Sequence, residues 1–493
     1  MSVSTPHPEY AEHQYAWKRC RDVVEGRDAL LRQARIWSRT NVRGSLFAVN
    51  SLFEEYIPRL SNQSDREYLT YCERASWFGA TGRTVDALSG LVMSKPPYIE
   101  LPQPIEQYAD DITLSACSLR EFAQQVVVEE ISTTRVGILV DYPQGVPPGL
   151  SRGDAERLNI RPFARMYKAE NILNWRTGII NGQQMLTMVV LTEMIDVPTG
   201  EFSADSQLRY RVLDLTPEGY RVRVMMGDGE VFSESFPLMN GAPMAYIPFV
   251  IVGGNEVRKP LLLDLVDTNI AHYRNSADYE HGLHFTGLPT PYVAGVQLPD
   301  GVSLQIGSMS AWVFPDPAAK AEYLEFKGDG LKTLADAMLT KERRMAVLGA
   351  RMLADEKRMA EASSTMEMRT AAERSLLAAT AYDVSDALRR ALNWMAEWVG
   401  VAPNCRFDLN VDFGAHRMEP QMLAQLVNAV QGDLMPMSVF IDNLRRGEIV
   451  RADVENEQYI AELEAEAPAS FATVPTAAEP QSLVARLRQN LGL

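Results

Sequence analysis

The sequence predicts an α+β fold in which helical stretches flank a β-rich middle. Three observations support it: a helical pattern over residues 1–130, alternating strands between Val136 and Met226, and long helical seams from Leu261 onward. With 493 residues and 46% hydrophobic content, the chain can build two to four domains, each with its own core.

The first 130 residues predict helices. Ser64 and Glu67 have the spacing of a capping box, in which each side chain binds the backbone N–H of the other residue. Pro96 and Pro97 interrupt the pattern, because proline has no amide hydrogen and clashes with the preceding turn. We expect a helical region that breaks at these two prolines.

The β-rich middle predicts an antiparallel sheet. Its apolar runs cover residues 136–140, 185–195, 208–215 and 220–226. In the last run Tyr220, Val222 and Val224 alternate with arginines, so one face is apolar and the other is charged. We therefore expect one face of the sheet to be exposed to solvent.

A helical hairpin is predicted between Leu261 and Leu353. Apolar residues recur at helical steps in the first helix, at Leu262, Val266, Ile270, Tyr273 and Ala277, and in the second, at Leu331, Leu334, Met338, Met345, Gly349 and Met352. Gly287 and Pro289 end the first helix. Such a narrow seam indicates packing against a single neighbour. Periodicity alone equally allows two amphipathic helices packed on a single-chain core.

The last part of the chain is predicted to be helical. A short charged segment, residues 354–363, precedes a capping box at Ser364 and Glu367. The long helix that follows has a seam at Leu377, Ala381, Val384, Leu388, Ala391, Met395 and Trp398. Residues 420–466 are predicted to form a helical region, and the Pro- and Ala-rich residues 467–493 predict a mobile tail.

Charge and cysteine usage exclude several classes of function. A formal net charge of -16 speaks against tight binding of nucleic acid, because such affinity comes from Lys and Arg that displace counterions. An acidic wall still allows DNA to pass close by. The four cysteines form no C-x-x-C pair, which indicates reduced thiols and no zinc site. No apolar stretch reaches the ~20 residues that span a bilayer. We therefore expect a soluble protein that is neither exported nor inserted in a membrane.

The sequence has no recognisable catalytic signature. It lacks the P-loop, H-E-x-x-H and G-x-S-x-G patterns. Glu280, His281 and His284 share a helical face, but no third strong ligand accompanies the histidines, so neither a metal nor a cofactor is predicted. Trp394 and Trp398 are one turn apart and indicate packing more than stacking on nucleic-acid bases. The alternative to a non-enzymatic protein is a soluble α/β enzyme with an unpatterned acidic active site.

Several strings carry a resemblance to a known family. In chain order they are residues 82–85, 95–97, 137–143, 161–163, 167–176, 269–280, 348–353 and 446–449. Together they resemble the portal proteins of tailed bacteriophages, the head-tail connectors, in the branch often named only as a domain of unknown function. Another ring-forming phage connector, such as a head-completion adaptor, is less favoured because those chains are usually much shorter.

The resemblance implies a non-enzymatic role in the virion. It implies a homo-oligomeric ring of about twelve subunits at one capsid vertex, present in the host cytoplasm during assembly. Double-stranded DNA would pass through its channel without sequence specificity, both in packaging and in genome ejection. The implied protein partners are the terminase large subunit, the major capsid protein, the scaffold and a head-completion or adaptor protein.

The resemblance also implies a division of the chain into the parts of a portal fold. In order, these parts are a mixed α/β wing (residues 1–260), stem helix 1 (261–287), a small clip (288–330), stem helix 2 (331–353), a tunnel loop (354–363), a long wing helix (364–419), a helical crown (420–466) and a C-terminal tail (467–493).

Three groups of site residues are expected from this division. DNA-facing residues of the tunnel loop are Lys357, Arg358, Glu356 and Glu361; the clip presents Pro299, Asp300 and Asp316 to terminase and adaptor; and the stem seam that packs subunits together comprises Val266, Ile270, Tyr273, Ala277, Leu334, Met338 and Met345. We expect Ile270→Asp to break ring assembly, because a charge would enter that seam.

Overall fold

The computed structural model describes residues 2–32, 56–59, 63–143, 152–180, 182–227, 229–287, 290–294, 318–324, 329–349, 363–411, 413, 426, 428 and 439–441. The chain divides into two units, Met1–Val411 and Asp412–Leu493, and the described helices and strands named below belong to the first. The expected tail and nearly all of the expected crown lie outside the described residues.

The described helices begin and end close to the sequence signals. They are α1 (Pro8–Glu25), α3 (Asp65–Arg74), α4 (Ala80–Val92), α5 (Gln103–Glu106), α6 (Leu119–Thr133), α7 (Arg152–Arg157), α8 (Leu263–Gly287), α9 (Asp329–Val347) and α10 (Ser363–Val399). The predicted capping box begins α3: Ser64 Oγ accepts from the Glu67 N–H, and Glu67 Oε2 accepts from the Ser64 N–H at 2.9 Å. A second box, Ser118 with Glu121, begins α6.

The described strands form small antiparallel sheets. They are β1 (Tyr98–Glu100), β2 (Val136–Asp141), β3 (Phe163–Lys168), β4 (Ile172–Ile180), β5 (Gln183–Pro198), β6 (Ala204–Thr216), β7 (Gly219–Met226), β8 (Val231–Ser235), β9 (Leu238–Met239), β10 (Ala242–Pro243), β11 (Phe249–Ile251), β12 (Thr290–Ala294), β13 (Lys320–Leu324) and β14 (Arg406–Asp408). The largest sheet has the order β4-β5-β6-β7-β8, and a three-stranded sheet has the order β11-β2-β3.

The five-stranded sheet has the predicted alternation. Tyr220, Val222 and Val224 of β7 are buried, whereas the intervening Arg221 and Arg223 are half-buried. The buried face belongs to a core that also contains Phe249 and Ile251 of β11. The α+β class predicted from the sequence is therefore confirmed, and the sheet is antiparallel as expected. The face expected to be exposed to solvent is only partly open, because Val212, which pairs with Arg223, is buried in a cluster with Val190 and Tyr210.

A second core lies among α1, α3 and α8. It contains Val23 of α1, Tyr68 of α3 and Tyr273 of α8. Cys20 and Cys72 are buried in it, and burial raises the pKa of the Cys20 thiol to about 12. This core packs the N-terminal half of α8 against the helices α1 and α3.

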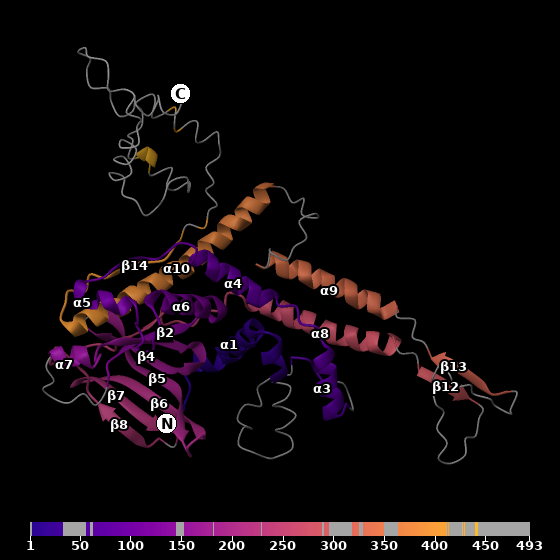
Figure 1. Ribbon diagram of the computed structural model, residues 1–493, viewed down its shortest axis with the longest axis horizontal. Coiled ribbons are helices and arrows are strands. Elements are labelled where there is room, and N and C mark those ends of the chain that lie inside the picture. The colour runs from indigo at the N-terminus through magenta and orange to yellow at the C-terminus, as the bar shows by residue number, and fades with distance from the viewer. Residues whose placement is uncertain are drawn as a thin grey trace, which may run out of the picture. The chain divides into compact units, whose positions relative to one another are not determined.

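Two long helices extend from this body side by side. Figure 1 shows α8 and α9 running together, with the β12–β13 pair at their free end. α8 ends at Gly287, as predicted, but α9 ends at Val347, earlier than the expected residue 353. The reason is Gly349, whose φ of +135° belongs to no right-handed helix. Gly349 therefore follows the end of the helix and is not a seam residue.

Candidate functional site: the α8–α9 hairpin

The first half of α8 is enclosed by the chain itself. Its expected seam residues Val266, Ile270, Tyr273 and Ala277 are all buried. They share one apolar cluster with side chains from α1 and α3, among them Cys20 and Tyr71. Protein interiors are close-packed, so a surface filled in this way cannot also receive a neighbouring subunit. The expected subunit-packing role of these four residues is wrong, because they form the core of the single chain.

A polar side of α8 is buried as well. Asn269 Oδ1 accepts from the Thr81 N–H at 3.2 Å and from the Thr81 hydroxyl at 2.9 Å. Asn269 Nδ2 donates to the carbonyl of Phe78 at 2.8 Å. Two turns along, the hydroxyl of Ser276 donates to the carbonyl of Ser76 at 2.8 Å. These bonds fasten α8 to the chain just before and at the start of α4, so the buried surface of α8 is wider than a single seam.

Two of the strings that resemble portal proteins meet at this contact. Gly82 lies in α4, where a Cβ atom would come within 2.9 Å of the carbonyl oxygen of Val24. Asn269, from a string far along the chain, binds the neighbouring Thr81. These positions allow helices to approach closely, and the strings therefore report on the fold more than on reactive chemistry.

The far end of α8 lies close to α9. A Cβ atom on Gly282 would come within 2.5 Å of Leu331 Cδ2, so glycine is what lets the two helices approach here. Closer to the N-terminus of α8, His272 Nε2 lies 3.1 Å from Glu342 Oε1. The two contacts show that α8 and α9 are antiparallel and in register over most of α9.

His272 is held in an unusual environment for a titratable group. Its side chain is buried, and its Nδ1 has no hydrogen-bond partner among the described residues. Burial lowers the pKa of His272 below its usual value, the hydrogen bond and charge of Glu342 oppose this shift, and Lys341 adds to it. The imidazole is therefore neutral at neutral pH and donates from Nε2 to the carboxylate.

The outward side of α9 is less covered. Its exposed side chains include Lys332, Leu339, Arg343, Arg344 and Val347. Of the expected seam residues on this helix, Met345 is buried within the chain, which removes it from subunit packing. Leu334 and Met338 are half-buried, so their packing against another subunit stays a prediction.

The tip of the hairpin is a two-stranded antiparallel pair. β12 follows α8 directly, β13 precedes α9, and their register runs from Thr290↔Leu324 to Ala294↔Lys320. The expected clip residues Pro299, Asp300 and Asp316 lie outside the described residues. The expected tunnel-loop residues Glu356, Lys357, Arg358 and Glu361 also lie outside them.

The residues weighed as metal ligands have other contacts. The His281 ring meets the ring of Tyr71 edge to face, with centroids 5.2 Å apart. His284 Nε2 lies 3.1 Å from Arg74 Nη2. Burial lowers the pKa of His281, and the charge of Arg74 adds to this shift. Within the described part of the chain, no group of three or more His, Cys, Asp or Glu side chains could hold a metal ion.

The two tryptophans of α10 are packing residues, as the sequence predicted. Trp394 stacks on Tyr246 with ring centroids 5.7 Å apart, and Trp398 stacks on Tyr142 at 5.6 Å. Both rings are only half-buried, but each ring is stacked on an aromatic side chain of the same chain. They are therefore not a free platform for nucleic-acid bases.

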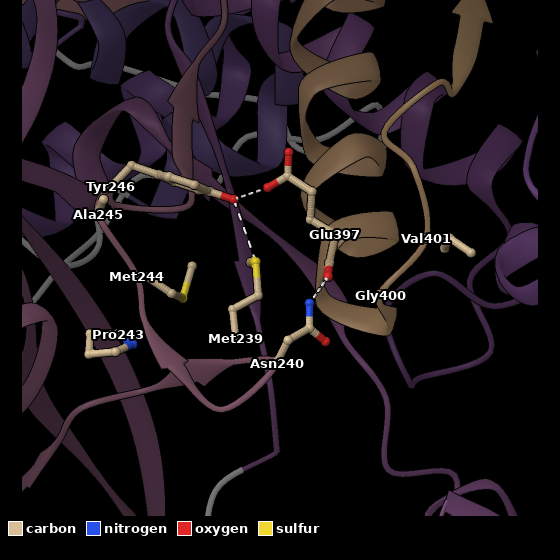
Figure 2. A pocket seen from close by; sticks show the side chains of 9 residues that line it. All are labelled: Met239, Asn240, Pro243, Met244, Ala245, Tyr246, Glu397, Gly400 and Val401. Atoms are coloured by element: carbon tan, nitrogen blue, oxygen red, sulfur yellow. Dashed lines mark hydrogen bonds between the residues drawn. The ribbon is translucent and has the colours of Figure 1, made fainter. Parts of the chain in front are cut away.

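An open cavity of about 440 Å³ lies at the C-terminal end of α10 (Figure 2). Its lining includes Met239, Asn240 and Met244, with Glu397 as the one carboxylate. The hydroxyl of Tyr246 donates to that carboxylate, and Asn240 Nδ2 donates to the Glu397 carbonyl at 2.8 Å. Burial and the Glu397 hydrogen bond raise the pKa of Tyr246. These polar groups close the end of the helix, and the cavity presents no acid–base pair.

No helix in the described part of the chain is long and apolar enough to cross a membrane.

Comparison with known proteins gives one family match. The family described as "Domain of unknown function (DUF4055)" matches residues 260–399, a stretch that contains α8, α9 and α10. No curated protein matches.

Solved structures give distant likenesses. A chain from the neck of an empty GTA particle, computed with C6 symmetry, is 12% identical with a TM-score of 0.39, over 74% of this chain and 89% of that one. A chain from the virion of a native gene transfer agent particle is 11% identical with a TM-score of 0.38, over 80% of this chain and 97% of that one.

Proposed function

We propose that this protein is the portal of a phage-like capsid. About twelve copies form a ring at one vertex, double-stranded DNA passes through the channel during packaging and ejection, and the ring docks head-completion or tail proteins. The observation that carries the proposal is the α8–α9 hairpin, two antiparallel helices rooted in an α+β body and ending in a two-stranded tip (Figure 1). The order of the portal-like strings supports the same conclusion.

The exposed side of α9 has the chemistry of a channel stem. Leu339 and Val347 are apolar and exposed, and in a ring they pack against the next hairpin. Arg343 and Arg344 are exposed on the same helix. Arg343 lies one turn from both Leu339 and Val347, so in a ring its charged head extends from this face to water at the edge of the contact. A net charge of -16 keeps the whole ring from holding DNA tightly, which a moving polymer requires.

The remaining parts of the ring are assigned from the sequence. Residues 354–363 are the tunnel loop, in which Lys357 and Arg358 contact the DNA backbone without reading its sequence. Residues 288–330 are the clip, the surface for the terminase large subunit and the adaptor. Residues 420–466 are the crown. The capsid protein and scaffold contact the ring during assembly in the host cytoplasm.

The first test is the oligomeric state of the full-length protein. Electron microscopy of purified particles, with mass photometry in solution, is expected to show closed rings near twelve subunits with an axial channel. Portals assemble on scaffold in some cases, so the preparation is repeated with the scaffold protein. A monomer or dimer under both conditions would overturn the proposal.

The second test addresses the channel. In a phage or particle that depends on this chain, Lys357→Ala combined with Arg358→Ala is expected to leave rings intact and to lower the amount of packaged or retained DNA. Arg66→Ala combined with Lys95→Ala removes two exposed charges from the body and is the matched control. Equal DNA content in both double variants would remove the tunnel-loop residues from the proposal.

A further inference from the structure

The five-stranded sheet carries an arm that reaches beyond its neighbours. β4 pairs with β5 only as far as Leu191, and β7 pairs with β6 only from Arg209. Between these points β5 and β6 pair with each other alone among the described strands, up to Pro198↔Ala204. We call residues 193–208 the arm. An isolated two-stranded ribbon is marginal in water, so an arm of this kind gains stability from a partner.

The arm exposes large apolar side chains. Met194 and Leu208 face each other across the strands and are 63% and 42% exposed. Phe202, in the turn, is 93% exposed. The turn is closed by a hydrogen bond in which the Thr199 N–H donates to the Ser203 carbonyl at 2.9 Å. A closed turn that presents a phenyl ring to water has the form of an interface anchor.

The base of the arm is clamped by a buried carboxylate. Glu193 Oε1 accepts from Tyr167 at 2.6 Å and from Arg211 at 2.8 Å. Glu193 Oε2 accepts from Arg209 at 2.8 Å, and Arg165 adds a further bond to Oε1 at 3.0 Å. The arm therefore leaves the sheet in a set direction, which lowers the entropy that docking would cost.

A socket of matching character lies at the opposite end of β5. This cavity of about 300 Å³ is lined by apolar and aromatic side chains, including Leu186, Phe249 and Trp394. Arg390 lies at its edge, with its side chain exposed and paired to Asp386 at 2.9 Å. We call the residues around this cavity, 184–186, 246–255 and 390–394, the socket.

The arm and the socket of one chain cannot meet. The socket includes the first residues of β5 and the arm its last, and a strand of 16 residues is about 50 Å long. A second copy has no such restriction. Charge favours the pairing too. Beyond the clamped Glu193, the arm carries Asp196, Glu201 and Asp205 with no Lys or Arg. At the socket, Arg390 and the adjacent Arg389 share the single carboxylate of Asp386, which leaves one positive charge in excess.

We propose that the arm of one copy docks on the next copy, with Phe202 inserted in the socket. The contact is head-to-tail, and a head-to-tail contact that closes on itself makes a ring. This inference rests on the proposed function and deepens it, because it names a surface that joins the subunits. It also replaces the α8 seam, which the single chain already fills.

The first test compares two exposed phenylalanines. Phe202→Ser is expected to weaken self-association at least about tenfold, because an apolar anchor leaves the interface. Phe202→Leu restores most of the assembly. Phe232→Ser, at a side chain 71% exposed on β8, is the control and assembles like the wild type. Mass photometry measures the distribution of species, and circular dichroism verifies the fold. Wild-type assembly by Phe202→Ser would overturn the inference.

The second test locates the contact and separates this inference from the proposed function. p-Benzoylphenylalanine placed at position 202 is photoactivated in a mixture of light and isotope-labelled full chains. The expected products are cross-links between copies to residues 184–186, 246–255 or 390–394. Cross-links only to other surfaces, or none between copies, overturn the docking even where rings form. Cross-links to the socket without any closed ring overturn the portal proposal and leave the docking standing.

Discussion

His272 Nε2 of α8 lies 3.1 Å from Glu342 Oε1 of α9, and this contact joins the two helices of the hairpin. The imidazole also meets the ring of Phe78, with centroids 5.3 Å apart. His272 is buried and Glu342 half-buried. One side chain thus touches the body and both helices, so its protonation is coupled to the way the hairpin is held.

The hairpin is expected to lose stability in mild acid. The folded-state pKa of His272 lies below 6.5, chiefly because of burial. The unfolded chain therefore binds this proton more readily, and the contribution of neutral His272 is complete above pH 6.5 and is lost as the pH falls through the folded pKa. Proton NMR titration of the histidines, assigned with a His272→Phe variant, measures that pKa directly.

Glu342→Gln separates the two opposing influences on His272. Removing the carboxylate removes the interaction that raises the pKa, so the pKa of His272 is expected to fall further. Asp336→Asn, at an exposed position of the same helix, is the control and leaves the His272 pKa in place. A higher His272 pKa in Glu342→Gln would show that the carboxylate does not face the imidazole.

Asn269→Leu is expected to loosen α8 from the body. The variant leaves the Thr81 N–H and the Phe78 carbonyl without their present partner. Each buried polar group deprived of a partner costs about 1–3 kcal/mol of unfolding free energy. Asn275→Leu, at a half-buried position of the same helix, is the control, with an expected cost of about 0.5 kcal/mol or less. Urea denaturation measures both, and equal midpoints would contradict the role of Asn269.

Local patterns in the sequence were sufficient to predict much of the fold. The alternation of Tyr220, Val222 and Val224 marked the buried face of β7, and Ser64 with Glu67 marked the start of α3. Both signals depend on residues a few positions apart, so the chain itself records them. The helical spacing of apolar residues in α10 is also a local signal. It predicted burial correctly, because the first six residues of the seam, Leu377 to Met395, are buried.

The partners of these faces were not predictable in the same way. The spacing of Val266, Ile270 and Tyr273 shows that one side of α8 is buried, but not that α1 and α3 cover it. The bonds of Asn269 span 188 residues to Thr81 and 191 residues to Phe78, so no local pattern contains them. The arm was missed for a similar reason, since the length of a strand does not tell where its neighbours stop pairing.

Ile270→Asp is accordingly expected to destabilise the folded chain itself. The sequence alone predicted that this variant would break the assembly of the ring. Ile270 is buried in the cluster of α1, α3 and α8, where a carboxylate has no partner. We expect a loss of about 3–5 kcal/mol of unfolding free energy. Leu283→Asp, at an exposed position near the end of α8, is the control and leaves stability within about 0.5 kcal/mol. Thermal denaturation of the dissociated protein measures the stability of both variants. An unchanged melting temperature in Ile270→Asp would contradict the assignment of Ile270 to the core.

Glu193→Gln is expected to destabilise the sheet and free the base of the arm. Burial alone raises the pKa of Glu193, but Arg211, Tyr167 and Arg165 outweigh it and hold the pKa at about 2. The carboxylate therefore contributes stability that is present above pH 4.5 and is lost as the pH falls toward 2. The neutral amide keeps the shape but leaves the arginines without their counter-charge, at a cost of about 3–5 kcal/mol near neutral pH.

The same variant tests whether Glu193 holds the arm in place. Because Glu193 bonds Arg209 across β5 and β6 at the base of the arm, loss of the carboxylate is expected to speed amide hydrogen exchange in residues 194–208. Glu234→Gln, which removes an exposed carboxylate 3.0 Å from Arg221, is the matched control, with an expected cost of at most about 1 kcal/mol and no change in the arm. The stability gap between wild type and Glu193→Gln should narrow below pH 4.5, as the wild-type carboxylate takes up its proton. A gap that stays constant down to pH 2.5, or an arm that exchanges at the wild-type rate, would show that this carboxylate does not hold the arm.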